Sequence, residues 1–436
     1  MQDTQLVQVS ASTDVSVVPA AAEEEVTLLV SLLAPAAEQP QRGPVSLIVV
    51  LDRSGSMAGG RLASAQRSLT SLVDRLSPTD TLGLVTFDNE IDVVVPAAPL
   101  TNKAEVKRRI AGVTPRGSTN LSGGLVRGLA EARRTDTSGP TTVLLLSDGK
   151  ANVGATDAAT LTALAARGRT DSITTSTLGV GLGYDETLLE AIAGGGTGNH
   201  YFAETPDDAA EAFATEIGGL LDAVALGTTV TLRPGALITE VRLLNQLPCA
   251  TLDEGLRVEV GDLYTEEQRR LVFRAHVQAP DSLGRSRLAQ IGTAWLDVSR
   301  QGAPVDSTLV VSVDIVDAAT AQDREVDQEI RGEADLLEAH RLRRDAADAL
   351  SHGDFDSADQ SLRRAMALAD EISPAVPDLL AAELDADRAL NEQYLGQMHG
   401  DARRVAKDAR ASAYRGSAKR GRQPRRDRSW KSEPSA

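Results

Sequence analysis

The sequence predicts an α/β domain with a mostly parallel central sheet, inserted into an antiparallel β-sandwich and followed by an α-helical segment. Residues 43–223 alternate between apolar strands and amphipathic helices, which is typical of a parallel sheet covered by helices on both faces. Strand-like segments without intervening helices flank this unit on both sides. The chain has 436 residues, which is enough for several domains.

The first strand of the α/β unit is expected over residues 46–52, which read SLIVVLD. Such a continuous apolar run is typical of a strand buried on both faces, and TTVLLLSDG (141–149) repeats the pattern. Residues 61–76 carry apolar side chains at helical spacing. Asn89 and Glu90 separate two strands in a way that favours an antiparallel hairpin. The remaining strands are expected over 81–88, 91–98, 172–181 and 199–204. The remaining helices are expected over 102–112, 157–168, 185–193 and 207–223, and one more helix opens at 116–125.

The flanking segments indicate one β-sandwich built from residues 1–42 and 224–318. Short strand-like runs separated by turn residues are typical of an antiparallel sandwich. Because the ends of a compact domain often lie close together, insertion of the α/β unit at 43–223 is geometrically simple. The runs lie at 6–12 and 25–35, and then at 230–244, 256–263, 269–279, 291–299 and 308–316.

The C-terminal part is predicted to be helical over 319–401. An antiparallel helix pair over 333–372 is expected to turn at His352, Gly353 and Asp354. Residues 402–436 contain twelve Lys or Arg and three Asp or Glu, and we interpret them as a basic, disordered tail. The whole chain carries a net charge of −17, so nucleic acid is not expected to be the main partner.

Composition also indicates the compartment. Cys249 is the single cysteine, so no disulfide can form within the chain. The N-terminal residues show no secretory signal, and no apolar run reaches the roughly 18 residues that span a membrane. We therefore expect a cytoplasmic protein.

Polar side chains gather where the two most apolar strands end. Residues 49–60 read VVLDRSGSMAGG, so the first strand leads into Asp52, Ser54 and Ser56, and the later strand ends at Asp148. The carboxyl ends of strands in an open parallel sheet form the ligand-binding crevice. Two neighbouring carboxylates repel each other unless a proton or a cation lies between them. Thr119, in RGSTN (116–120), can add a hydroxyl from a third loop.

These residues form a candidate metal site: Asp52, Ser54, Ser56, Thr119 and Asp148. Five oxygen donors without cysteine or histidine favour a hard cation, which we predict to be Mg²⁺, with Mn²⁺ or Ca²⁺ as substitutes.

Three segments resemble the metal-ion-dependent adhesion site of von Willebrand factor type A domains. They are Asp-Arg-Ser-Gly-Ser at 52–56, Gly-Ser-Thr-Asn at 117–120 and Ser-Asp-Gly at 147–149, in the family's order. The resemblance covers about residues 43–223 and implies a Rossmann-like fold. It also implies that Ser54, Ser56 and Thr119 bind the ion directly, that Asp52 and Asp148 reach it largely through water, and that one position stays open for a partner's Asp or Glu.

The flanking architecture resembles bacterial cytoplasmic proteins of this family. Some of these work beside MoxR-type AAA ATPases, so such an ATPase is a candidate partner. Arg53 lies in the first metal loop, where it can meet an acidic ligand or simply face solvent.

The sequence bears on two other functions, a metal-dependent hydrolase and a structural scaffold. A metal-dependent hydrolase needs a general base near the ion, but only His200 lies in the α/β unit, and we expect it at the edge opposite the crevice. No G-x-S-x-G motif occurs, so we predict that the chain is not an enzyme. A structural scaffold that recruits partners through the helical segment and the tail remains the alternative.

Overall fold

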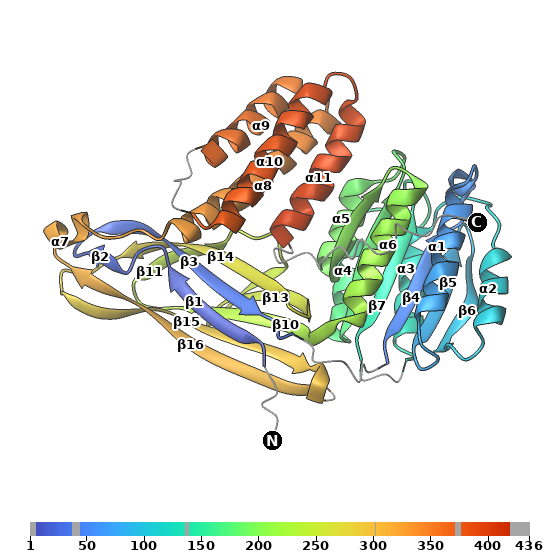
Figure 1. Cartoon of the computed structure of the whole chain (residues 1–436), viewed down its shortest axis with the longest axis horizontal. Coiled ribbons are helices and arrows are strands. Elements are labelled where there is room, and N and C mark those ends of the chain that lie inside the picture. Colours follow the sequence, from blue (N-terminus) through green and yellow to red (C-terminus); the bar gives the residue numbers. More distant parts are fainter. Residues whose placement is uncertain (1–5, 37–43, 136–138, 301, 371–375, 419–436) are drawn as a thin grey trace.

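The chain forms three bodies, which the computed structural model describes over residues 6–36, 44–135, 139–300, 302–370 and 376–418. Figure 1 shows a β-sandwich, an α/β domain beside it and a group of helices that rises between the two. No helix among the described residues is long and apolar enough to cross a membrane.

The α/β domain is built on a six-stranded sheet with the order β6-β5-β4-β7-β8-β9. Neighbouring strands are parallel except β5 and β6, which form the antiparallel hairpin that Asn89 and Glu90 predicted. All seven residues of the central strand β4 are buried. The strands are β4 (Ser46–Asp52), β5 (Thr81–Phe87), β6 (Ile91–Pro99), β7 (Thr141–Ser147), β8 (Ile173–Val180) and β9 (Thr197–Ala203).

Helices cover both faces of this sheet, because β4 alternates its side chains between two cores. Leu47, Val49 and Leu51 pack in the core with α1 and α6, whereas Ile48 and Val50 pack in the core with α3, α4 and α5. The mostly parallel α/β fold is therefore confirmed. The helices are α1 (Arg61–Arg75), α2 (Lys103–Ala111), α3 (Leu121–Ala132), α4 (Ala158–Thr170), α5 (Glu186–Gly195) and α6 (Pro206–Leu221).

The sandwich combines strands from before and after the α/β domain, as predicted. The N-terminal strand β3 pairs with β14 along its whole length, from Glu23 to Leu33. All strand pairs in both sheets are antiparallel except the short parallel pair of β2 and β16. One sheet has the order β1 (Gln8–Thr13), β3 (Glu23–Leu33), β14 (Gln268–Gln278), β11 (Ile238–Leu243); the other has the order β12 (Cys249–Leu252), β13 (Gly255–Tyr264), β10 (Ala223–Pro234), β15 (Gly284–Asp297), β16 (Ala303–Val316), β2 (Val17–Pro19).

One predicted strand, 230–244, is in fact two strands in different sheets. β10 ends at Pro234 and β11 begins at Ile238. Proline has no N–H to continue a ladder, and the Gly235 N–H turns to the Leu288 carbonyl at 2.7 Å. The chain therefore crosses from one sheet to the other at this point.

Both chain segments that lead into and out of the α/β domain meet one turn of the sandwich. The Thr265 N–H donates to the Asp222 carbonyl at 2.8 Å, and the Glu266 N–H donates to the Pro35 carbonyl at 3.2 Å. We call residues 264–268, which connect β13 to β14, the neck turn. The two ends of the inserted domain are thus held side by side.

The helical segment extends further than the sequence analysis predicted. It contains α7 (Ala318–Gln322), α8 (Gln328–Ser351), α9 (Phe355–Asp370), α10 (Asp378–Gln397) and α11 (Ala402–Ala418). The predicted turn between α8 and α9 is present, with Gly353 at φ +77°. The predicted disordered tail was wrong for residues 402–418, which form α11; residues 419–436 lie outside the described part of the chain.

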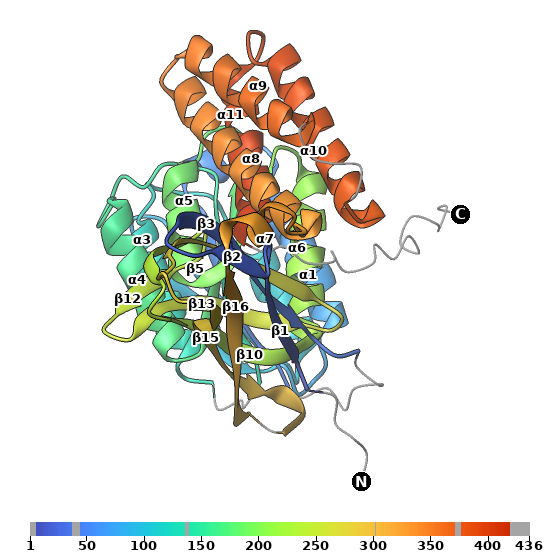
Figure 2. The same ribbon diagram turned by 90° about the vertical axis from the view of Figure 1, so that its left-hand side faces the viewer.

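Helix α11 is ordered because its small and apolar residues are buried despite its many positive charges. Val405, Ala406 and Ala409 pack in the core of the helical segment. The Tyr414 hydroxyl donates to the Gly198 carbonyl of the α/β domain at 2.9 Å. The buried Lys407 ammonium donates to the Tyr184 carbonyl at 2.8 Å. Figure 2 shows the helical segment resting across both other bodies.

A buried arginine joins the two sheets of the sandwich. Arg269, on β14, is 2% exposed and pairs with Glu267 at 2.5 Å. Its guanidinium also donates to the Val260 and Asp262 carbonyls of β13, at 3.3 and 3.1 Å. One side chain of β14 therefore satisfies acceptors on the neck turn and on β13 of the other sheet.

Replacement of Arg269 by leucine should destabilise the sandwich by about 3–5 kcal/mol, because it leaves Glu267 and two carbonyls buried without their partner. Chemical denaturation followed by circular dichroism measures the loss. Arg285→Leu, at an exposed position of β15 in the other sheet of the sandwich, is the matched control and should change stability by less than about 0.5 kcal/mol. Equal losses in the two variants would contradict the role given to Arg269.

Candidate metal centre

The five predicted metal-site residues lie at one edge of the α/β sheet. β4 and β7 are parallel neighbours, so the residues at their carboxyl ends, Asp52 and Asp148, emerge at the same edge. Ser54 and Ser56 follow β4 in a short turn, and Thr119 lies just before α3. This is where an open parallel sheet places its ligand crevice.

Asp52 fixes the first loop. Its side chain is fully buried, and its Oδ1 accepts the Ser54 N–H at 2.8 Å. Its Oδ2 accepts the Ser147 hydroxyl at 2.6 Å, which joins the end of β4 to the end of β7. Both carboxylate oxygens therefore have donors, and the loop after β4 has a defined direction.

The serine hydroxyls connect the first loop to Asp148. Ser54 Oγ lies 3.0 Å from Ser56 Oγ, and Ser56 Oγ donates to Asp148 Oδ1 at 2.6 Å. A Cβ atom added to Gly149 would lie 3.3 Å from Ser56 Oγ and 3.4 Å from Thr119 Oγ1. The structure thus gathers the three hydroxyls and Asp148 around one point, with Asp52 directly behind them.

Backbone hydrogen bonds hold the loop of Thr119 against the first loop. The Gly55 N–H donates to the Gly117 carbonyl at 3.1 Å, and the Arg116 N–H donates to the Arg53 carbonyl at 2.7 Å. Gly117 has φ +71°, and a Cβ there would lie 3.0 Å from Asn89 Oδ1. Glycine is favoured at this position, because a side chain would be strained at this φ and would press against Asp88 and Asn89.

The donor set fits a small divalent cation. Mg²⁺ holds oxygen ligands at about 2.1 Å in octahedral geometry, which places adjacent ligands about 3.0 Å apart. The two serine hydroxyl oxygens are 3.0 Å apart. The Ser56 hydroxyl donates its hydrogen bond to Asp148, so the lone pairs of Ser56 Oγ stay available to a cation. The described residues contain no group of three or more His, Cys, Asp or Glu placed to hold a metal, and the site described here combines two aspartates with three hydroxyls.

The electrostatics of the site also favour a cation. The pKa of Asp52 is raised to about 6, chiefly by burial and to a smaller extent by the charge of Asp148, while hydrogen bonds from Ser147 and Ser54 act in the opposite direction. A buried carboxylate beside a second carboxylate is stabilised by a positive charge. The arrangement is therefore chemically suited to bind a divalent ion.

Arg53 neither meets the crevice nor faces solvent, the two alternatives that the sequence left open. Its side chain is 10% exposed and lies 3.2 Å from Asp88 and 2.5 Å from Asp92. Arg116 contacts the same two carboxylates. Although burial acts in the opposite direction, the pKa of Asp88 is lowered by hydrogen bonds from the Glu90 N–H and from Arg116 and by both guanidinium charges. These ion pairs hold the loops of Arg53 and Arg116 in place.

Two side chains that contact the site were not among its five predicted ligands, although Ser147 belongs to the predicted Ser-Asp-Gly segment. Ser147 holds Asp52, and Arg61 contacts Asp148 at 2.9 Å. Ser147 precedes Asp148 directly, so its place at the strand end was a usable signal. Arg61 lies 87 residues from Asp148, and nothing in the local sequence links the two.

His200, the one histidine that the sequence places in the α/β unit, makes its described hydrogen bond within the sheet. It lies on β9, at the sheet edge, where it is fully buried with Nδ1 2.9 Å from Thr177 Oγ1. Burial lowers its pKa to about 3, so the ring is neutral. It has no described contact with Ser54 or Ser56.

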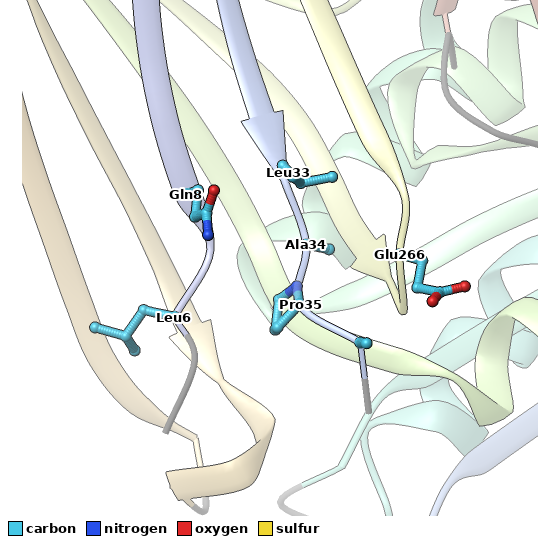
Figure 3. A pocket seen from close by; sticks show the side chains of 7 residues that line it. Leu6, Gln8, Leu33, Ala34, Pro35 and Glu266 are labelled. Atoms are coloured by element: carbon cyan, nitrogen blue, oxygen red, sulfur yellow. The ribbon is translucent and has the colours of Figure 1, made fainter. Parts of the chain in front are cut away.

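A separate hollow in the sandwich does not offer comparable chemistry. Figure 3 shows it beside the ends of β1 and β3, close to the neck turn. Glu266 is its one ionisable lining residue, and the others are apolar or neutral: Leu6, Gln8, Leu33, Ala34, Pro35 and Ala36.

Comparison with known proteins identifies the α/β domain. Residues 46–216 match the family described as von Willebrand factor type A domain. Two bacterial relatives are an uncharacterized protein of Synechocystis, sll0103, 28% identical over 57% of this chain and 61% of its own, and YfbK of Escherichia coli, 32% identical over 48% of this chain and 37% of its own. The chain thus spans less than two thirds of either relative.

Solved structures share the fold of almost the whole chain. A von Willebrand factor type A protein from Catenulispora acidiphila has a TM-score of 0.70 at 17% identity and covers 95% of this chain and 98% of its own. VWA2, the ArnB paralog of Sulfolobus acidocaldarius, has a TM-score of 0.67 at 15% identity, with coverage of 95% and 100%. With the family match and the three-loop site, these findings show that the α/β domain of this chain is a von Willebrand factor type A domain.

Proposed function

We propose that this chain binds a protein partner through a divalent cation, Mg²⁺ in the first instance, held by Ser54, Ser56, Thr119, Asp52 and Asp148. The partner supplies a glutamate or aspartate side chain. The observation that carries this proposal is the convergence of three loops on one point, with Ser54 Oγ 3.0 Å from Ser56 Oγ and Ser56 Oγ 2.6 Å from Asp148.

The chemistry of the site supports binding rather than catalysis. A bound divalent ion supplies an electrophilic position that a carboxylate can occupy. The residues of this chain hold the ion and orient the loops: Ser147 fixes Asp52, and the backbone of Gly117 fixes the first loop. Von Willebrand factor type A domains generally mediate protein–protein interactions, which agrees with this role.

The partner and compartment are further parts of the proposal. A MoxR-type AAA ATPase is the candidate partner that the family resemblance suggests. A cytoplasmic location agrees with the single, exposed Cys249, which has no second cysteine with which to form an internal disulfide.

Titration of the purified chain with Mg²⁺ by isothermal calorimetry tests the metal directly. Capture of partners on the immobilised chain in Mg²⁺, with release by EDTA, tests the adhesion. Binding that persists in EDTA would show that the helical segment carries the contact, which is the scaffold alternative.

Thr119→Ala should weaken Mg²⁺ binding at least about tenfold, because it removes one oxygen ligand. Ser118→Ala, on the same loop, is the matched control, because only the Ser118 backbone N–H makes a described hydrogen bond. The Mg²⁺ affinity of this variant should equal that of the unmodified chain. Calorimetric titration of both variants measures the difference. Equal affinities in the two variants would remove Thr119 from the site.

Mg²⁺ binding should tighten as the pH rises through about 6, because Asp52 must lose its proton to join the ion. The raised pKa also means that, without metal, the protonated form of Asp52 stabilises the fold. This contribution is fully present below the unfolded pKa of 3.8 and is lost as the pH rises through about 6. Mg²⁺ should therefore raise the melting temperature more at pH 7 than at pH 5.

Thermal unfolding with Mg²⁺ and with EDTA at both pH values measures this difference. In EDTA, Asp52→Asn should remove the part of the pH dependence that Asp52 contributes. A Mg²⁺ effect of the same size at pH 5 and pH 7 would contradict the role of Asp52.

A further inference from the structure

We propose that the positive charge of Arg61 keeps the metal centre positively charged. This charge lowers the affinity of the site for the divalent ion and raises the affinity of the bound ion for a carboxylate. The inference rests on the proposed metal-dependent function and deepens it.

The contacts of Arg61 are directed at the site. Its Nη1 donates to Asp148 Oδ2 at 2.9 Å and to the Ser56 carbonyl at 2.8 Å. The Asp148 side chain is completely buried, whereas that of Arg61 is 45% exposed. The guanidinium therefore covers the carboxylate from the solvent side and contacts the first and third metal loops at once.

The position of Arg61 is not explained by the helix that carries it. Arg61 is the first residue of α1, and a positive charge at a helix N-terminus is opposed by the helix dipole. The first turn of α1 contains no acidic residue that would offset it. Gly181, at φ +71°, makes room for the guanidinium, since a Cβ there would lie 3.3 Å from Arg61 Nε.

The contact leaves the proposed ligand oxygens in place. Asp148 uses Oδ1 for the Ser56 hydroxyl and Oδ2 for Arg61. Arg61 contacts Ser56 through its backbone carbonyl, so the Ser56 hydroxyl is not occupied by the guanidinium. Arg61 can therefore stay on Asp148 whether or not a cation is held by the hydroxyls.

The net charge of these groups sets the affinity of the centre for the divalent ion and for a carboxylate. Asp52 and Asp148 together neutralise a divalent ion, and a neutral centre attracts an anionic side chain only weakly. Arg61 adds one positive charge within hydrogen-bond distance of Asp148. That charge repels the divalent ion and attracts an incoming carboxylate. Removal of the charge should therefore have opposite effects on the two affinities.

Arg61→Gln should bind Mg²⁺ about tenfold more tightly than the unmodified chain in calorimetric titration at low ionic strength. Arg61→Lys keeps the charge and should stay within about twofold of the unmodified chain. Arg67→Gln is the matched control, because it removes an exposed positive charge from the same helix further from the site. It should also stay within about twofold.

The second measurement uses Mn²⁺ as the bound ion and acetate as the carboxylate probe. Acetate that joins the bound ion displaces water, which lowers the water-proton relaxation enhancement of Mn²⁺. The acetate concentration needed to lower this enhancement should be about tenfold higher for Arg61→Gln than for the unmodified chain or Arg61→Lys.

Three outcomes would overturn the inference. Weaker Mg²⁺ binding by Arg61→Gln would show that Arg61 only positions Asp148. Equal metal affinities in Arg61→Gln and Arg67→Gln would show that its charge is without effect. Absence of metal uptake by every variant, including the unmodified chain, would overturn the proposed function itself and so is distinct from the first two results.

Discussion

Two carboxylates buried at the end of an apolar sheet are the constraint on which this structure depends. Asp52 and Asp148 are 0% and 2% exposed, so their charge must be offset by the protein or by a cation. The chain offsets it in part with the Ser54 N–H and the hydroxyls of Ser56 and Ser147. These donors fix the loops, so the protein's own hydrogen bonds maintain the geometry of the site.

The rest of the architecture keeps that edge of the sheet in place. Arg53 and Arg116 brace the loops from one side through Asp88. On another side, Lys407 of α11 holds the Tyr184 carbonyl, and Gly183 of the same loop passes so close to the Asp148 carbonyl that a Cβ would lie 2.8 Å from it. The helical segment thus contacts the loop that packs against Asp148. Arg61, which contacts Asp148, belongs to a fourth segment of the chain.

Features that depend on neighbouring residues could be predicted from the sequence, and features that depend on distant ones could not. The run SLIVVLD predicted β4, and the short motifs predicted all five residues that the structure brings together. The break at Pro234 was missed because the flanking residues remain strand-like. Helix α11 was missed because its charges were counted while its buried face was not. Arg61 could not be assigned because its partner lies 87 residues away.

The neck turn contacts both chain segments that connect the von Willebrand domain to the sandwich. The carbonyls of Pro35 and Asp222 accept hydrogen bonds from adjacent residues, Glu266 and Thr265. No strand pair within the described sandwich uses a residue between these two carbonyls. The strand order of the sandwich therefore does not depend on the von Willebrand domain, although Thr174 still joins that domain to Asp262 of the sandwich and Tyr414 joins it to the helical segment.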